Sequence, residues 1–177
     1  MTYHPRLVTR RLYVLLLVWV SIPVLAAGYT LGNGEIHFFV PDNWPMIMEQ
    51  TQGEPQFIAF QVPDTSPSGK QVLSRVTVTM HQVIDIAEFR SWVKAQVHKS
   101  HSLPGYQANG KHHSRRFVYH ALENGVRMQY LEQYYFKNGY AVQLRCLRPQ
   151  HDQSGETWQN AFDRGCQQIA HSLNGPQ

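Results

Sequence analysis

Apolar and polar residues alternate with a period of two along much of the chain, a pattern that predicts β-strands. It predicts strands over residues 35–40 and 72–81, and a short return strand over 46–49. Residues 56–62 are apolar on both faces, so we expect a central strand there. Residues 63–70 combine prolines, serines and a glycine, and they predict the clearest loop of the chain.

Two stretches have the period of an amphipathic helix instead. The first covers residues 86–101, where Asp85 is well placed to cap the first turn. The second covers 156–173, with Ser154 as its predicted cap. Gly175 follows this second helix, and we expect it to end the helix in a left-handed conformation.

Two Asn-Gly pairs divide the segment between these helices into three strands. We expect tight turns at Asn124-Gly125 and Asn138-Gly139, because both residues of such a turn need positive φ. Glu123 or Lys137 can lengthen either loop by one residue, so the strand register stays open. The predicted strands are 116–122, 126–136 and 140–147. The order of strands, helix, three strands and helix predicts an α/β fold of the α+β type, with an antiparallel sheet and helices on its faces.

The first 27 residues have the features of an export signal. Arginines come first, an apolar run follows, and small residues close the segment. We expect cleavage after Ala26 or Ala27, which leaves 28–177 as a single domain in the periplasm or the medium. The alternative is an inner-membrane anchor formed by residues 12–27, although a spanning helix needs roughly 20 apolar residues and this run has 16.

Removal of this leader changes the charge of the chain. The whole chain carries 16 Lys and Arg against 12 Asp and Glu, a net charge of +4. Three of the arginines lie in the leader, so the remaining chain carries 13 − 12 = +1. Such a small charge does not indicate a nucleic-acid partner, and a membrane partner is expected only if the leader is retained.

The chain has two cysteines, Cys146 and Cys166. An exported chain with an even number of cysteines favours a disulfide, and each cysteine lies on the apolar face of its predicted element. Closing a loop of this length contributes about 3 kcal/mol to stability in the chain-entropy account. Two buried free thiols are the alternative, and the spacing does not match a redox-active Cys-x-x-Cys pair.

The pattern also resembles a known superfamily. Residues 36–44 read as an opening strand followed by proline and tryptophan, and the capped helix, the strand at 140–146 and the closing helix at 162–173 follow in the expected order. This order resembles the PsbP-like and DcrB-like superfamily over most of 29–174. The resemblance implies an α/β/α sandwich on an antiparallel sheet and an accessory, regulatory or chaperone role. It implies no site residues, because no shared functional motif is present.

Four histidines are candidates for a metal site, since His98 and His101 share a helix face and His112 and His113 follow in the next loop. The alternative is that all four are solvated polar residues. The helical pair lacks the glutamate of a His-Glu-x-x-His motif. We therefore predict no metal and no cofactor.

Three aromatic residues, Trp44, Tyr134 and Tyr135, are candidates for a binding surface, because tryptophan and tyrosine are enriched at interfaces. The alternative for the two tyrosines is core and edge packing in the sheet, and for Trp44 it is a lid over the end of the sheet.

The sequence has no Gly-x-Ser-x-Gly elbow or other catalytic motif. We expect an exported envelope protein that is not an enzyme and acts by binding a protein partner, with a secretion-associated or immunity role as one form. The alternatives are a periplasmic metal- or small-ligand-binding protein with a pocket between sheet and helix, and a hydrolase whose site assembles only in three dimensions.

Overall fold

The computed structural model describes residues 26–110, 115–150 and 154–175. The predicted leader lies outside these residues except for Ala26 and Ala27, which belong to the first strand. Within the described residues, no helix combines the length and the apolar content needed to cross a bilayer.

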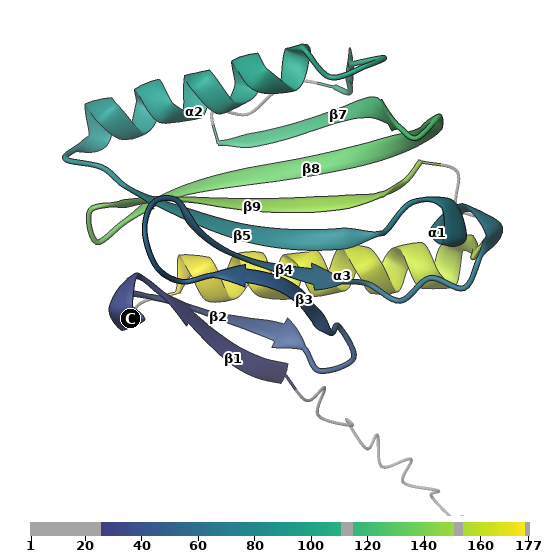
Figure 1. Ribbon diagram of the computed structural model, residues 1–177, viewed down its shortest axis with the longest axis horizontal. Helices are drawn as coiled ribbons and strands as arrows, with labels where there is room; N and C mark the ends of the chain where they lie inside the picture. Colours follow the sequence, from purple (N-terminus) through teal and green to yellow (C-terminus); the bar gives the residue numbers. More distant parts are fainter. Residues whose placement is uncertain (1–25, 111–114, 151–153, 176–177) are drawn as a thin grey trace, which may run out of the picture.

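The described residues form two antiparallel sheets and three α-helices (Figure 1). The strands are β1 (Ala26–Leu31), β2 (Ile36–Pro41), β3 (Met46–Gln50), β4 (Gln56–Gln61), β5 (Arg75–Gln82), β6 (Gln107–Ala108), β7 (Arg116–Glu123), β8 (Val126–Lys137) and β9 (Tyr140–Pro149). The helices are α1 (Pro67–Gln71), α2 (Ile86–His101) and α3 (Gly155–Asn174), and a 3₁₀ turn covers Gly32–Gly34. β1 and β2 pair with each other, and the larger sheet has the order β3-β4-β5-β9-β8-β7-β6. The predicted α+β fold is confirmed.

Both predicted Asn-Gly turns form two-residue hairpin loops. Asn124 and Asn138 have φ of 49° and 50°, and the glycine after each also has positive φ. Glu123 pairs with Val126, and Lys137 pairs with Tyr140, so neither loop is lengthened. These two turns fix the register of β7, β8 and β9.

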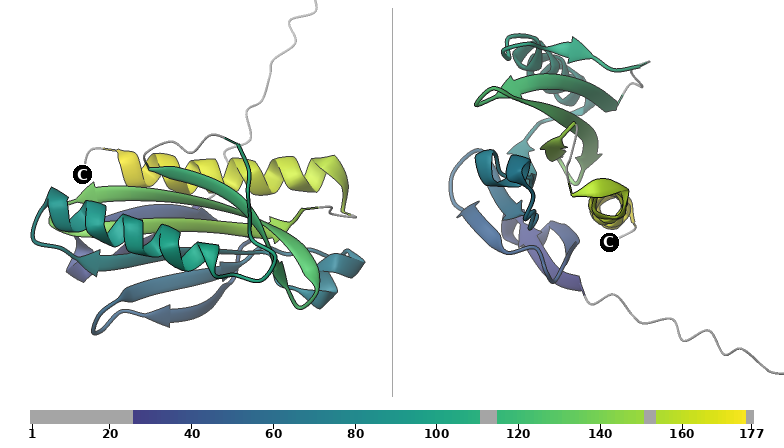
Figure 2. Two further views of the ribbon diagram at one scale, coloured as in Figure 1. Left: turned by 90° about the horizontal axis from the view of Figure 1, so that it is seen from above. Right: turned by 90° about the vertical axis from the view of Figure 1, so that its right-hand side faces the viewer.

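The larger sheet has helices on both faces. Figure 2 shows α3 along one face, close to the β1–β2 hairpin, and α2 over the far end of the other face. The main core fills the α3 side, where side chains from β2, β4, β5 and β9 meet α3. Cys146 of β9 and Cys166 of α3 form a disulfide in this core, with 6.4 Å between their Cα atoms. The disulfide therefore joins the middle strand of the sheet to the closing helix.

Helix α2 covers only part of the opposite face. Asp85 caps it as predicted, since its Oδ1 accepts from the backbone N–H groups of Ala87 and Glu88. Phe89 and Val93 pack onto β8 and β9. The central strands beside α2 carry polar side chains on this face, and these form the site described below.

The structure differs from the sequence-based expectations in several local features. Residues 67–71 form helix α1 within the predicted loop, because Ser66 caps Gly69 N–H and Pro67 suits the first helical turn. An additional strand, β1, precedes the predicted first one. β4 is second from the edge, and β9 is the middle strand.

The ends of α3 also differ from the prediction. Ser154 makes no capping bond, and its hydroxyl donates to Asp64 instead. Gly175 ends the helix with extended φ and ψ of −63° and 157°, not in the left-handed conformation.

Candidate functional site

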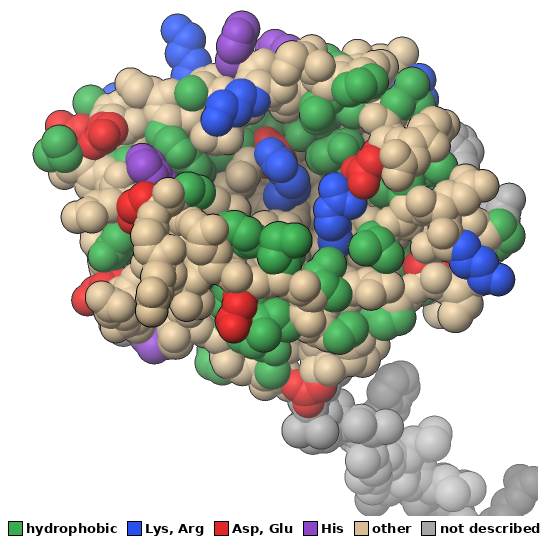
Figure 3. All heavy atoms as spheres, viewed as in Figure 1, with side chains coloured by type: hydrophobic (Ala, Val, Ile, Leu, Met, Phe, Trp, Pro, Cys, Tyr) green, Lys and Arg blue, Asp and Glu red, His purple; other side chains and the backbone are tan. Residues whose placement is uncertain are grey.

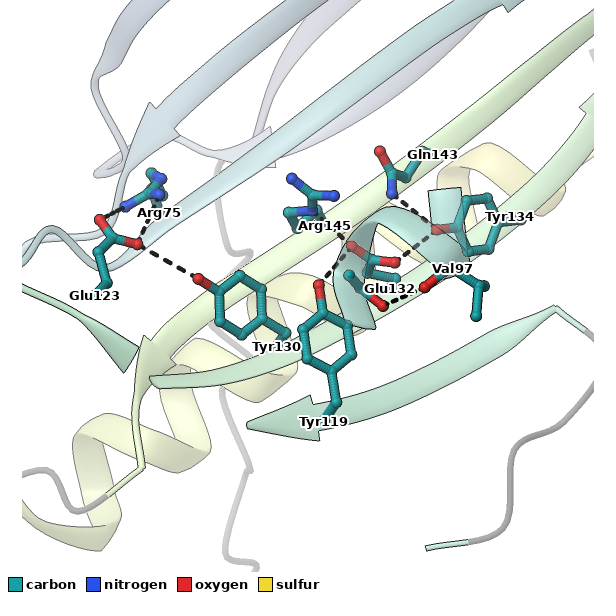
Figure 4. Close-up of polar contacts among 10 residues, drawn as sticks. Arg75, Val97, Tyr119, Glu123, Tyr130, Glu132, Tyr134, Gln143 and Arg145 are labelled. Carbon is teal, nitrogen blue, oxygen red and sulfur yellow. Dashed lines mark hydrogen bonds and ion pairs between the residues drawn. The ribbon is translucent and has the colours of Figure 1, made fainter. Parts of the chain in front are cut away.

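A completely buried carboxylate, Glu132, lies at the centre of the α2-facing side of the sheet. Tyr119 donates its hydroxyl to Oε1 at 2.9 Å, and Tyr134 donates to Oε2 at 2.6 Å. Nε of Arg145 also donates to Oε1, at 2.7 Å. Gln143 extends the network by donating to the Tyr134 hydroxyl at 2.9 Å (Figure 4). Three donors thus satisfy the Glu132 carboxylate, which has no exposed surface.

The strand register brings these groups together. Glu132 of β8 stands directly opposite Arg145 of β9, and Tyr134 stands opposite Gln143. Tyr119 of β7 reaches Glu132 from the other side. Directly opposed side chains in an antiparallel pair are close enough to interact. The two hairpin turns therefore determine the network.

Burial and charge shift the pKa values of the network. Desolvation raises the pKa of both Tyr119 and Tyr134, and the negative charge of Glu132 raises it further. Desolvation alone would lower the pKa of Arg145, but Glu132 and the two tyrosines raise it by more. At neutral pH, therefore, both phenols are protonated donors and Arg145 is a cation.

A second ion pair lies beside the network. The guanidinium of Arg75 donates to both carboxylate oxygens of Glu123, at 2.8 and 2.9 Å. The Tyr130 hydroxyl approaches the same carboxylate at 3.5 Å. Unlike Glu132, both members of this pair are partly exposed.

These two groups border a pocket of about 400 Å³ between the C-terminal half of α2 and the sheet. We call it the central pocket. Its lining residues are Arg75, Gln96, Lys99, Ser100, Leu103, Leu122, Glu123, Tyr130 and Arg145. Figure 3 shows basic side chains gathered in a hollow near the middle of this face.

The free part of Arg145 faces this pocket. Its Nε is bound to Glu132, and 39% of the side chain is exposed. Its two Nη atoms have no hydrogen-bond partner in the described part of the chain. The cations at the pocket are Arg75, Lys99 and Arg145. The carboxylates are Glu123 and, behind Arg145, Glu132, so the local charge is 3 − 2 = +1. The pocket therefore presents unused N–H donors of a fixed cation, a suitable arrangement for binding an anion.

The predicted metal candidates do not converge in the described residues. His98 and His101 are exposed on α2, and the His101 ring packs against Tyr106 at 4.6 Å between centroids. His112 and His113 lie outside the described residues. The described part of the chain contains no cluster of three or more His, Cys, Asp or Glu residues that could hold a metal ion.

The three aromatic candidates are buried. Trp44 is 5% exposed and stacks on Phe162, and Tyr134 is 1% exposed within the network around Glu132. Tyr135 is 8% exposed on the α3 side and donates to Gln133. Their placement is that of packing residues and not of an exposed binding surface.

The sequence-based reasoning missed Glu132, Arg145 and Lys99 as site residues. A signal for two of them was present. A two-residue loop at 138–139 places position 132 opposite position 145, so the turn itself predicts a carboxylate facing an arginine. The pair was not predicted because the sequence left open whether Lys137 lengthens that loop by one residue, which would change the register. No local pattern in the sequence indicates that Lys99 faces the same pocket.

Comparison with known proteins identifies the fold and no closer relationship. No protein-family model matches the chain, and no curated protein matches it. The crystal structure of a protein of unknown function from Pseudomonas aeruginosa, suggested to be a regulator, is 14% identical with a TM-score of 0.51. The match covers 86% of this chain and 97% of that one.

Two further structures are similar. LpqN, involved in cell envelope biogenesis of Mycobacterium tuberculosis, is 13% identical with a TM-score of 0.52 over 83% of this chain and 88% of its own. The solution structure of PsbP from the cyanobacterium Synechocystis is 11% identical with a TM-score of 0.47 over 85% and 94%. At such identities these likenesses concern the fold alone, which is the level at which the PsbP-like resemblance was predicted.

Proposed function

We propose that this chain is an accessory protein of the bacterial cell envelope that binds a protein partner, and that an acidic side chain of the partner enters the central pocket. The observation that carries the proposal is the fixed, partly exposed guanidinium of Arg145. A secretion-associated or immunity role is one form that this binding can take.

The geometry of Arg145 favours recognition of a carboxylate. Its Nε is already bound to Glu132, so the guanidinium is held in one orientation before any ligand arrives. The two Nη groups can then donate in parallel to both oxygens of a carboxylate. A group ordered in advance loses less entropy on binding, which increases affinity. Lys99 at the edge of the pocket adds a second, more mobile cation.

The same network supports binding over catalysis. Glu132 has no exposed surface, and both of its oxygens already accept hydrogen bonds. The raised pKa values of Tyr119 and Tyr134 keep these phenols protonated at neutral pH. A general base must accept a proton from a bound substrate, and none of these three groups is free to do so.

The envelope location rests on two supports. The leader pattern of residues 1–27 predicts export. The LpqN structure, which shares the fold, belongs to a protein of cell envelope biogenesis. Both supports are compatible with an accessory role in the envelope.

A photo-crosslinking amino acid at Gln96, which lines the pocket, tests the proposal in cells. We expect a crosslinked partner whose attached peptide contains Asp or Glu, and we expect Lys99→Glu to reduce the yield about tenfold because it reverses a pocket charge. Lys94→Glu is the matched control, since it reverses a charge on the same helix outside the pocket. A yield unchanged by Lys99→Glu, or turnover of a substrate that requires Glu132, would contradict the proposal.

A further inference from the structure

A second hollow lies on the other side of α2, between residues 86–97 of this helix and the start of β7. Its volume is about 490 Å³, within the range of roughly 300–1,000 Å³ that is usual for small-molecule sites. The lining residues are Ile86, Phe89, Arg90, Val93, Lys94, Val97, Arg115 and Phe117. We call it the α2–β7 groove. Its described lining has no residue in common with that of the central pocket.

The floor of the α2–β7 groove is apolar. Phe89 is 2% exposed and Val93 is 8% exposed, although both line the groove. An amphipathic helix of a partner would need a wide exposed apolar face, with anchors at every third or fourth position. The groove therefore offers a limited apolar lining, since Ile86 is exposed at one end and Val97 and Phe117 are half-buried. A single hydrocarbon chain needs no more apolar lining than this.

The rim of the groove carries charge of one sign. Its charged lining residues are Arg90, Lys94 and Arg115, and the described lining includes no carboxylate. None of the three forms an ion pair within the described residues. The guanidinium of Arg115 lies 5.9 Å from the centre of the Phe89 ring, where the apolar floor meets the rim. The rim can therefore hold an anionic head group whose tail lies along the floor.

We propose that the α2–β7 groove binds a single-chain alkyl carboxylate, that is, a fatty-acid-like amphiphile. Burial of the tail against Phe89, Val93 and Val97 supplies affinity, and the cationic rim selects the carboxylate. This site is separate from the central pocket and does not depend on the function proposed for it.

Calorimetric titration of the full chain with dodecanoate, which is monomeric below its micellar concentration, tests the site. We expect saturable binding of one molecule per chain. Each methylene removed from the tail should weaken it about fourfold, the factor that corresponds to the burial of one such group. Dodecyltrimethylammonium, with the same tail and the opposite charge, should bind at least about tenfold more weakly.

Variants connect the binding to this groove. The double variant Arg90→Glu and Lys94→Glu should weaken dodecanoate binding about tenfold or more, since it reverses two exposed charges of the rim. Val97→Trp should abolish binding by filling the groove, and its melting temperature will show that it still folds. Lys99→Glu, on the same helix but in the central pocket, should leave binding unchanged.

Several outcomes would overturn the proposal. They are the absence of dodecanoate binding, equal binding of the cationic detergent, and binding that neither Val97→Trp nor the double variant affects. Binding to phosphatidylglycerol vesicles without binding to monomeric dodecanoate would also overturn it, because the ligand would then be a membrane surface.

Discussion

Nε of Arg145 lies 2.7 Å from Oε1 of Glu132, which joins an arginine with 39% of its side chain exposed to a carboxylate with no exposed surface. A buried carboxylate without hydrogen-bond partners lowers the stability of the folded protein. Removing the carboxylate also lowers it, because the donors are then left without an acceptor. The stability of this part of the sheet therefore depends on the Glu132 carboxylate as the shared acceptor.

We predict that Glu132→Ala lowers the free energy of unfolding by about 3–5 kcal/mol, because it leaves the Tyr119 and Tyr134 hydroxyls and Arg145 without their acceptor. Urea denaturation measures the change. Glu123→Ala is the matched control, since it removes a partly exposed partner of Arg75 and should cost at most about 1 kcal/mol. Equal losses for the two variants would show that the burial of Glu132 adds nothing to its contribution.

Stability should fall in alkaline solution. Burial raises the pKa of Tyr135 to about 12, from the ordinary value of 10.0. Between these pH values the unfolded chain releases the phenolic proton while the folded chain keeps it. The unfolded state then binds fewer protons, so the free energy of unfolding falls as pH rises, by about 1.4 kcal/mol per pH unit.

Tyr119 and Tyr134 also have raised pKa values and should add to this slope. Urea denaturation at pH 9, 10 and 11 measures it. Tyr135→Phe should make the slope shallower, because this residue no longer titrates in either state. An identical slope in wild type and variant would argue against the raised pKa of Tyr135.

Gly165 of α3 should not tolerate a larger residue. A Cβ atom at this position would overlap the indole of Trp44 and crowd Pro41. Alanine usually stabilises a helix by about 1 kcal/mol relative to glycine, but overpacking costs about 1–3 kcal/mol. We therefore predict a net loss of stability for Gly165→Ala in thermal unfolding.

A second substitution separates these two effects. Trp44→Phe opens space beside Gly165, so the Gly165→Ala change should cost less in that background than in wild type. If the cost is the same in both backgrounds, the overlap with Trp44 is not its cause.

The disulfide should stabilise the oxidised chain. Cys146 and Cys166 are 20 residues apart, and a loop of this size corresponds to about 3 kcal/mol in the chain-entropy account. We expect a reductant to lower the melting temperature of the wild type. The Cys146→Ala, Cys166→Ala double variant should melt at the same temperature with and without reductant, and an insensitive wild type would contradict the prediction.

Local features of the sequence were enough to predict most of the elements. The Asn124-Gly125 and Asn138-Gly139 pairs specify a conformation that few other residues adopt, so their turns can be identified without any tertiary information. Asp85 is similar, because the bonds of a helix cap join neighbours in the sequence. The short helix α1 was not predicted, because its five residues are too few to show the apolar periodicity of a helix.

The candidate site depends on longer-range information. Glu132 and Arg145 are 13 residues apart and meet only if the loop at 138–139 has two residues. A single extra residue would turn one of them to the other face of the sheet. Lys99 requires in addition the position of α2 on the sheet, which no residue pattern near it specifies. Residues whose role depends on how elements dock are thus the ones that sequence patterns leave out.

The exposed edge of the larger sheet has a chemical consequence. All five residues of β3 are exposed, and Met46 and Met48 retain 43% and 59% of their surface. Met80 and Met128, at 1% and 0%, are enclosed. A peroxide reaches thioethers according to their accessibility. Oxidant should therefore convert Met46 and Met48 to sulfoxides while Met80 and Met128 remain reduced. Oxidation at this edge would then leave the packing of the core unchanged.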